Sequence, residues 1–319
     1  MNEAFSNTVV VGAGAVGSFY GAMLARAGLR VTLIGREAHV EAIRREGLRL
    51  LMGGGEERIA VAASTDLAVV READLVLFCV KSTDTAATAR AMAPHLKADA
   101  LVLCMQNGVD NAPRLLELLP NPVLAAAVYV AVAMPEPGAV QHFGRGELLV
   151  GWARAAQPEA LAALRLAALV AYFAAGGIKV EVSPKVMTEL WNKLLANCAF
   201  NAISGLTQLP YGVMAALPDI REVQELLVRE VVAVAQAEGQ ALEVDAGMAT
   251  VDRIAASMPG QFSSTAQDMA RGKPSEIDHL NGYVARRGAE LGLATPVNQT
   301  LWALVKLAEF GRKEKIGEG

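Results

Sequence analysis

The chain has 319 residues, which is enough for about two domains, each with its own hydrophobic core. Its formal net charge of −4 provides no basic surface for nucleic acid, while a mean hydropathy of +0.32 raises the question of a membrane protein. The longest apolar runs, Val123–Met134 and Leu166–Ile178, are shorter than the roughly 20 residues of a transmembrane helix. We therefore expect a globular protein with neither nucleic acid nor membrane as a partner.

The cysteines and histidines follow no disulfide or metal-binding pattern. Cys79, Cys104 and Cys198 are odd in number, widely spaced and set among apolar residues, which suits a reducing cytoplasm. The four histidines are scattered, and no two are spaced to bind a metal on one helix face. We expect a cytoplasmic protein without a metal site.

In the first half of the chain, short β-rich runs alternate with helical stretches. The predicted strands are Thr8–Val11, Arg30–Ile34, Leu75–Val80, Leu101–Met105 and Val123–Val132, and the predicted helices are Ser18–Ala27, His39–Glu46, Thr85–Leu96 and Ala112–Leu119. Leu48–Leu51 and Ile59–Ala62 are joined by three glycines and predict a hairpin. Repeated strand–helix–strand units predict a Rossmann-type, doubly wound, mainly parallel sheet.

Beyond Val182 the pattern changes to helical periodicity. The predicted helices are Val186–Ile203, Ile220–Ala237, Ala246–Ala256, Glu276–Leu291 and Gln299–Phe310. Ser183-Pro184 offers a natural break, because proline is acceptable in the first helical turn. We predict an α/β domain over residues 1–182 followed by an all-helical domain over residues 183–319.

A glycine-rich segment, Gly12-Ala13-Gly14-Ala15-Val16-Gly17, directly follows the first predicted strand and opens a helix. This is the place of the dinucleotide-binding fingerprint. Gly12 would permit the tight turn, Gly14 would let the backbone approach a pyrophosphate, and Gly17 would let the helix pack closely on the strand. All six residues are therefore candidates for cofactor binding, and the alternative is a sharp turn in a fold that binds no nucleotide.

The second predicted strand ends in Gly35-Arg36, and this bears on the choice of cofactor. An acid there typically binds the ribose 2′-hydroxyl of NAD, whereas an arginine accommodates the 2′-phosphate of NADP. Arg36 therefore favours NADP(H). Glu37 would offer a carboxylate if the alignment shifted by one residue, although a first-turn helix acid is its simpler interpretation. An ordinary solvated turn residue is the alternative for Arg36.

Lys81 and Asn107 follow two further predicted strands. Open α/β sheets bind their ligands at the carboxyl ends of strands, so both residues are candidates for the site. The alternatives are a surface lysine beside a helix start and a common Asn-Gly turn.

In the second half, Lys193, Asn197 and Asn201 recur every four residues and so share one side of a helix. Two asparagines and a lysine suit a core poorly, and asparagine is also an indifferent helix former on a surface. A helix face that lines a water-filled cleft would explain why these residues suit neither a core nor an exposed helix surface. A solvated helix face is the alternative. Farther on, Ser264 and Glu276 are explained in isolation as a helix cap and a first-turn acid.

Together these segments resemble the ketopantoate reductase (2-dehydropantoate 2-reductase) family over nearly the whole chain. The motifs that carry the resemblance are Gly12–Gly17, Val80-Lys81, Gln106-Asn107-Gly108, the helix with Trp191, Lys193, Asn197 and Asn201, and Ser263-Ser264 followed by Glu276-Ile277-Asp278. The resemblance implies a Rossmann domain, a helical domain and an active site between them. It also implies NADPH-dependent reduction of ketopantoate to pantoate, on the route to pantothenate and coenzyme A.

The resemblance further implies roles for individual residues. Lys193 corresponds to the catalytic lysine, and Glu276 to an acid that holds the substrate hydroxyl and assists catalysis. The positions that match substrate contacts are Asn197, Asn201, Ser264 and Asn107. Lys81 and Asn107 match residues beside the nicotinamide, and Arg36 matches the residue that binds the 2′-phosphate. Thr265 departs from the family pattern, because a methionine is common there.

Two other functions stay open. The first is an NADP-dependent reductase of another small 2-oxo acid, which would use the same lysine. The second is a non-enzymatic NADP(H) sensor, although a sensor would not need the polar stripe formed by Lys193, Asn197 and Asn201. Helical second domains often supply dimer contacts, which leaves a homodimer open as well.

Overall fold

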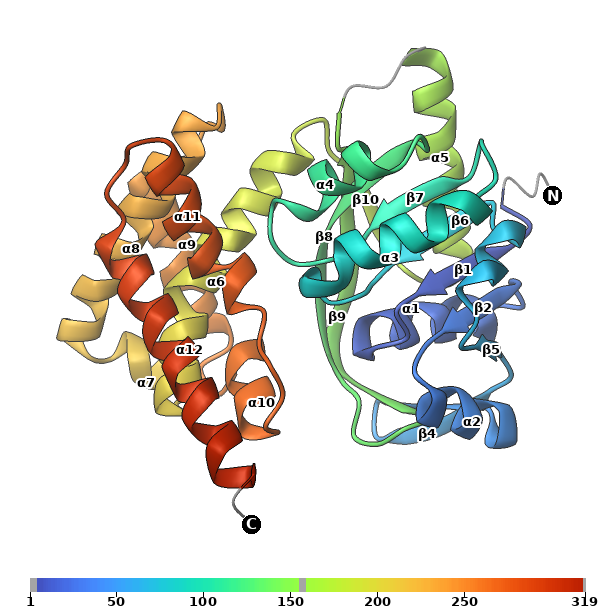
Figure 1. Cartoon of the computed structure of the whole chain (residues 1–319), viewed down its shortest axis with the longest axis horizontal. Helices are drawn as coiled ribbons and strands as arrows, with labels where there is room; N and C mark the ends of the chain where they lie inside the picture. The colour runs from blue at the N-terminus through green and yellow to red at the C-terminus, as the bar shows by residue number, and fades with distance from the viewer. Residues whose placement is uncertain (1–4, 155–158, 318–319) are drawn as a thin grey trace. The chain divides into compact units, whose positions relative to one another are not determined.

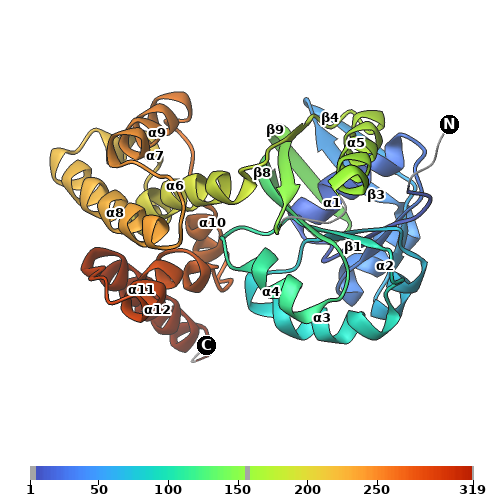
Figure 2. The same cartoon turned by 90° about the horizontal axis from the view of Figure 1, so that it is seen from above.

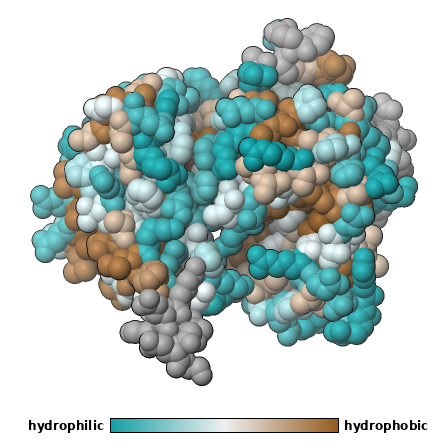
Figure 3. Space-filling model, viewed as in Figure 1, coloured by the Kyte–Doolittle hydropathy of each residue, from teal (hydrophilic) through white to brown (hydrophobic). Residues whose placement is uncertain are grey.

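The computed structural model describes residues 5–154 and 159–317, with side chains up to residue 311. The chain divides at Val186–Met187 into two compact units, one built on a sheet and one built of helices (Figure 1). In the described part of the chain, every helix is too short or too polar to cross a bilayer. The face shown in Figure 3 carries polar residues interspersed with apolar areas in both units.

The first unit is organised by parallel strands that run through its centre. Their order across the sheet is β5 (Ala62–Ser64), β2 (Val31–Ile34), β1 (Thr8–Val11), β6 (Leu75–Phe78), β7 (Leu101–Cys104) and β8 (Val123–Ala133). Numbered along the chain, these six strands follow the order 3-2-1-4-5-6 of a dinucleotide-binding sheet. The prediction of a doubly wound Rossmann-type sheet is confirmed.

An extension makes the sheet mixed rather than purely parallel. β9 (Ala139–Trp152) runs antiparallel to β8, and both β3 (Leu48–Met52) and β10 (Val180–Val182) pair with β9 in parallel. Sequence patterns missed β9 because glycines and charged residues interrupt its alternation, and because its pairing with β8 contains irregularities beside Val130 and Val132.

The predicted hairpin exists, but its second strand was placed wrongly. β3 pairs antiparallel with β4 (Gly55–Ile59), not with a strand at Ile59–Ala62. Residues from Ala62 onward form β5, which pairs with β2 on the other side of the sheet. The run at Ile59–Ala62 therefore spans the end of one strand, where Ile59 is buried, and the start of another.

Helices cover both faces of the sheet. They are α1 (Ala15–Arg26), α2 (Glu37–Glu46), α3 (Thr85–Met92), α4 (Asn111–Leu118) and α5 (Glu159–Ala175). Phe19 and Tyr20 of α1 and Phe173 of α5 belong to one core cluster with the sheet, whereas α3 and α4 lie on the other side of β1 (Figure 2). Since both faces are covered, the central strands are buried throughout, as in β1 and β6.

The second unit is all-helical, as predicted. It contains α6 (Val186–Thr207), α7 (Tyr211–Ala215), α8 (Pro218–Ala237), α9 (Val244–Ser257), α10 (Ser264–Ala270), α11 (Asn281–Glu290) and α12 (Pro296–Gly317). The predicted helix over Glu276–Leu291 is divided into a short 3₁₀ helix, Ile277–His279, and α11. Leu280 separates the two with a φ of −113° and a ψ of −107°, a backbone conformation that an α-helix cannot include.

Candidate active site

The predicted residues of the first unit follow strands that end at one edge of the sheet. Val11 of β1 pairs with Ile34 of β2 and Phe78 of β6, and Phe78 pairs with Cys104 of β7. Because these strands are parallel and in register, the segments after them share the carboxyl edge. That edge carries the turn Gly12–Gly17, Arg36, Lys81 and Asn107.

The turn at residues 12–17 has the geometry that its glycines suggest. Gly12 has a φ of +101°, and a Cβ there would lie 2.6 Å from the backbone nitrogen of Val80. A Cβ on Gly17 would lie 2.3 Å from the Gly12 carbonyl oxygen, so the start of α1 packs tightly on the turn. Around Gly14, in contrast, a Cβ would meet nothing within 4 Å. Glycine at this position leaves room for a ligand close to the backbone and the N-terminus of α1.

Arg36 is the residue immediately before α2, and its side chain is exposed. Within the described residues, its guanidinium has no hydrogen-bond or ion-pair partner. Glu37 lies in the first turn of α2, where an acid interacts favourably with the helix dipole. The carboxylate of Glu37 thus has a structural explanation, whereas Arg36 is accessible to an anion.

His39 connects several elements near this edge of the sheet through hydrogen bonds of its ring. Its ring is buried, and its Nδ1 accepts a hydrogen bond of 2.8 Å from the backbone N–H of Gly138. Because Nδ1 accepts, the neutral ring carries its proton on Nε2, which lies 3.1 Å from the Ser18 hydroxyl of α1. Burial lowers the pKa of His39. The residue therefore joins α1, α2 and the β8–β9 connection through an uncharged imidazole.

Lys81 and Asn107 are half-buried and lie in the segments after β6 and β7. The two segments are joined by hydrogen bonds between buried side chains that sequence reasoning did not assign to the site. These bonds involve Ser82, Thr85, Gln106 and Asn111. The signal in the sequence was faint: small polar residues next to strand ends, which also suit helix starts.

In the second unit, the polar stripe on α6 passes from partial to full burial. Lys193 and Asn197 are half-buried, and Asn201 is 2% exposed. The apolar neighbours Leu194 and Phe200 are buried as well. A fully solvated helix face is therefore excluded for Asn201.

Asn201 lies next to Ser264, one of the other predicted substrate residues. Its Nδ2 donates to the Ser264 hydroxyl over 3.3 Å, across 63 residues of sequence. The interpretation of Ser264 as a helix cap is wrong, because Ser263 caps α10 and its hydroxyl accepts from the Ala266 N–H over 3.0 Å. Ser264 is exposed and is the first residue of the helix.

Glu276 is half-buried and directly precedes the 3₁₀ helix Ile277–His279. It is not a first-turn acid of a long helix, since α11 begins only at Asn281. The predicted residues of the second unit thus come from α6, from the start of α10 and from the segment before Ile277. Together they offer one ammonium, one carboxylate, two amides and a hydroxyl.

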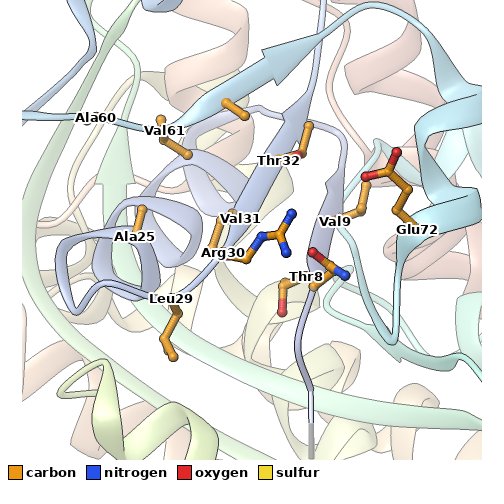
Figure 4. Close-up of a pocket in the computed structure, with 12 residues that line it drawn as sticks. Thr8, Val9, Ala25, Leu29, Arg30, Val31, Thr32, Ala60, Val61 and Glu72 are labelled. Carbon is orange, nitrogen blue, oxygen red and sulfur yellow. The ribbon is translucent and has the colours of Figure 1, made fainter. Parts of the chain in front are cut away.

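A cavity of about 260 Å³ lies elsewhere in the first unit, at the amino ends of β1 and β2 (Figure 4). Thr8, Arg30 and Glu72 are among its lining residues, and all predicted site residues lie outside it. Ligands of open α/β sheets bind at the opposite edge. In the described parts of the chain, no cluster of three or more His, Cys, Asp or Glu residues is arranged to hold a metal ion.

The strand order and the glycine turn define a dinucleotide-binding protein of the Rossmann class with a helical second unit. Residues 8–154 match the family model "Ketopantoate reductase PanE/ApbA", and residues 185–309 match "Ketopantoate reductase PanE/ApbA C terminal". The 2-dehydropantoate 2-reductase of Halobacterium salinarum is 37% identical over 94% of this chain and 98% of its own. That of Vibrio cholerae is 31% identical over 95% and 98%.

Solved structures agree with this assignment. A PanE/ApbA family ketopantoate reductase from Ralstonia eutropha JMP134 superposes with a TM-score of 0.89 and 50% identity, over 96% of this chain and 99% of the other. A D-mandelate dehydrogenase bound to NADH and anilino(oxo)acetate shares the fold, with a TM-score of 0.89 at 24% identity over 96% and 99%. The chain belongs to the ketopantoate reductase family, whose members are NAD(P)-dependent reductases of 2-oxo acids.

Proposed function

We propose that this protein reduces 2-dehydropantoate to pantoate with NADPH, the reaction that supplies pantoate for pantothenate and coenzyme A. The observation that carries the proposal is the stripe on α6, which holds Lys193 on the same side as Asn201, itself hydrogen-bonded to Ser264. A lysine among neutral donors suits a substrate that has a carboxylate, a carbonyl and a hydroxyl. The family membership and the sequences of the relatives support the same choice.

The residues of the first unit fit a dinucleotide phosphate. The open space at Gly14 would receive the pyrophosphate beside the free N–H groups of α1, and the exposed guanidinium of Arg36 would bind the 2′-phosphate. Lys81 and Asn107 would contact the nicotinamide end. When bound, NADPH supplies the hydride that the reduction requires.

The residues of the second unit would stabilise the negative charge that forms during the reduction and would supply the proton. Addition of hydride to the keto carbon leaves negative charge on the carbonyl oxygen. The Lys193 ammonium would stabilise that charge and donate the proton that completes the alcohol. Asn197, Asn201 and Ser264 would hold the substrate through hydrogen bonds without competing for this proton, and Glu276 would hold the substrate hydroxyl.

A second candidate is a reductase of another small 2-oxo acid. The fold is shared with D-mandelate dehydrogenase, whose substrate side chain is aromatic, and Thr265 replaces a methionine that is common beside the serine pair. The same lysine and the same hydride chemistry would serve either substrate. The two candidates differ only in the side chain that the site accepts.

The test is a panel of 2-oxo acids scored by NADPH oxidation with the purified protein. We expect kcat/KM for 2-dehydropantoate to exceed that for pyruvate, 2-oxoisovalerate and phenylglyoxylate by at least a hundredfold. A higher kcat/KM for one of the other acids would refute the proposed substrate but retain the reductase class. Absence of turnover on every acid would favour the NADP(H) sensor.

A further inference from the structure

The loops after β6 and β7 are joined by hydrogen bonds between buried side chains. Gln106 Nε2 donates to the carbonyl of Val80 over 2.9 Å and to the Thr85 hydroxyl over 2.7 Å. Thr85 Oγ1 in turn donates to Asn111 Oδ1 over 2.9 Å. Residues from two loops and two helices thus form one continuous network under the carboxyl edge.

Asn111 completes the network from α4. Its Nδ2 donates to the backbone carbonyl of Asn107 over 2.7 Å and to the Ser82 hydroxyl over 2.9 Å. Asn107 is a proposed cofactor and substrate residue, and Ser82 adjoins the proposed cofactor residue Lys81. One side-chain amide therefore contacts both loops that carry the nicotinamide end of the site.

The direction of every bond in this network is determined. A carbonyl can only accept, so the nitrogen of the Asn111 amide must face Asn107, and its oxygen is left for the Thr85 hydroxyl. Asn111, Thr85 and Ser82 are each at most 1% exposed. Water therefore cannot replace a lost partner, and the loss of one of these polar groups leaves its buried partner unsatisfied.

We propose that Asn111 and Thr85 are positioning residues for the cofactor: they hold the loops of Lys81 and Asn107 at a constant separation so that the nicotinamide end binds in one orientation. The proposal rests on the proposed function, because it needs a nicotinamide dinucleotide at this edge. Hydride transfer is sensitive to misplacement of about 1 Å, and such precision depends on the residues behind those that touch the ligand.

A purely structural role is the competing explanation, and the chain offers a matched control for it. Asn121 is 4% exposed, and its Nδ2 also donates two hydrogen bonds, to the backbone carbonyls of Lys97 at 2.8 Å and Ala100 at 3.1 Å. It precedes β8 and lies at the amino edge of the same sheet. Asn121 is thus, like Asn111, a buried amide that donates two hydrogen bonds, but it lies at the edge away from the proposed site.

The experiment compares Asn111→Asp with Asn121→Asp. Each change keeps the size of the side chain and puts a carboxylate oxygen where an amide N–H donated to a backbone carbonyl. The carbonyl is that of Asn107 in Asn111→Asp, and the carbonyls are those of Lys97 and Ala100 in Asn121→Asp. We expect both variants to melt at lower temperature. Only Asn111→Asp should weaken the binding of NADPH and of NADH, by about tenfold or more in fluorescence titrations of the protein without substrate at a temperature where all proteins are folded. Equal dissociation constants for the two variants would overturn the proposal.

Thr85→Val and Thr85→Ser provide a second test should Asn111→Asp fail to fold. Valine keeps the shape of threonine and removes the hydroxyl that joins Gln106 to Asn111, whereas serine keeps the hydroxyl. We expect Thr85→Val to weaken NADPH binding about tenfold and Thr85→Ser to restore it to within threefold of the wild type. Wild-type affinity in Thr85→Val would refute the network's role.

These titrations separate this proposal from the proposed function. A wild-type protein that binds NADPH but turns over no 2-oxo acid would refute the reductase assignment, while the comparison of dissociation constants would still decide the role of Asn111. Conversely, normal binding in Asn111→Asp would leave the reductase assignment intact.

Discussion

At the residue scale, one guanidinium after β2 is expected to distinguish two cofactors that differ by a single phosphate. Arg36 is exposed and accessible to an anion, and a charge-assisted hydrogen bond contributes about 1.5–3 kcal/mol. We predict that Arg36→Ala raises the KM for NADPH at least tenfold and leaves the KM for NADH nearly unchanged. Steady-state kinetics with both cofactors measures this.

Arg30→Ala is the matched control, because Arg30 is an exposed arginine at the opposite end of β2. It should leave both KM values unchanged. An unaltered KM for NADPH in Arg36→Ala would remove this residue from the cofactor site.

The ammonium of Lys193, on α6, is expected to donate the proton to the reduced carbonyl oxygen. We predict that Lys193→Ala lowers kcat by about 10²–10⁴-fold, the usual contribution of a positioned acid, while NADPH still binds with wild-type affinity. Kinetics and a fluorescence titration provide the two readouts. Lys185→Ala, which removes an exposed lysine just before α6, should have normal kcat. Near-normal turnover in Lys193→Ala would reject the assigned role.

His39 is expected to make stability depend on pH, because its buried, neutral ring accepts from Gly138 N–H. Burial lowers its pKa in the folded protein, so below about pH 6.5 the unfolded chain binds the proton more readily than the folded one does. The free energy of unfolding should therefore fall as pH decreases from about 6.5 to the folded pKa, by at most about 1.4 kcal/mol per pH unit.

Urea denaturation of the wild type, His39→Gln and His95→Gln at several pH values tests this sign. His39→Gln should lose part of the slope, whereas His95→Gln should keep it, since His95 is exposed. Identical slopes in all three proteins would show that His39 contributes nothing to the pH dependence.

At the element scale, two adjacent serines at the start of α10 are expected to have different roles. Ser263 stabilises the helix, and Ser264 is proposed to bind the substrate. Ser263 is buried and caps the helix, so Ser263→Ala should lower the free energy of unfolding by about 0.5–2 kcal/mol. Ser264 is exposed and bonds Asn201, so Ser264→Ala should raise the KM for the 2-oxo acid several-fold with little loss of stability.

Urea denaturation and steady-state kinetics on both variants measure the two effects. The opposite pattern, with a destabilised Ser264→Ala and an impaired KM in Ser263→Ala, would mean that the roles of the two serines are exchanged.

At the scale of the whole molecule, the division into two compact units predicts two thermal transitions in calorimetry. NADPH should raise the midpoint of the α/β unit, because a ligand at 100 times its Kd adds about 2.7 kcal/mol of stability. Arg36→Ala should show a smaller shift at the same concentration. Unchanged midpoints with saturating NADPH would argue against the cofactor site.

Features that depend on local chemistry could be predicted from the amino-acid order alone. Short apolar runs predict strands buried on both faces, glycines at positions 12, 14 and 17 predict the nucleotide turn, and a period of four places Lys193 and Asn197 on one helix face. Each follows from the preferences of a few neighbouring residues. The shared location of Arg36, Lys81 and Asn107 was predictable from a general rule of folds, since the carboxyl ends of neighbouring parallel strands lie along one edge.

Contacts between distant residues became known only from the folded chain. The pairing of Asn201 with Ser264 spans 63 residues, and that of Asn111 with Ser82 spans 29. The folded chain also shows that Ser263 caps α10, that residues from Ala62 onward join β2, and that β9 extends the sheet. Such pairings depend on long-range burial and hydrogen bonding. These forces outweigh the weak local preferences of serine, asparagine and glycine, so no short window of sequence contains them.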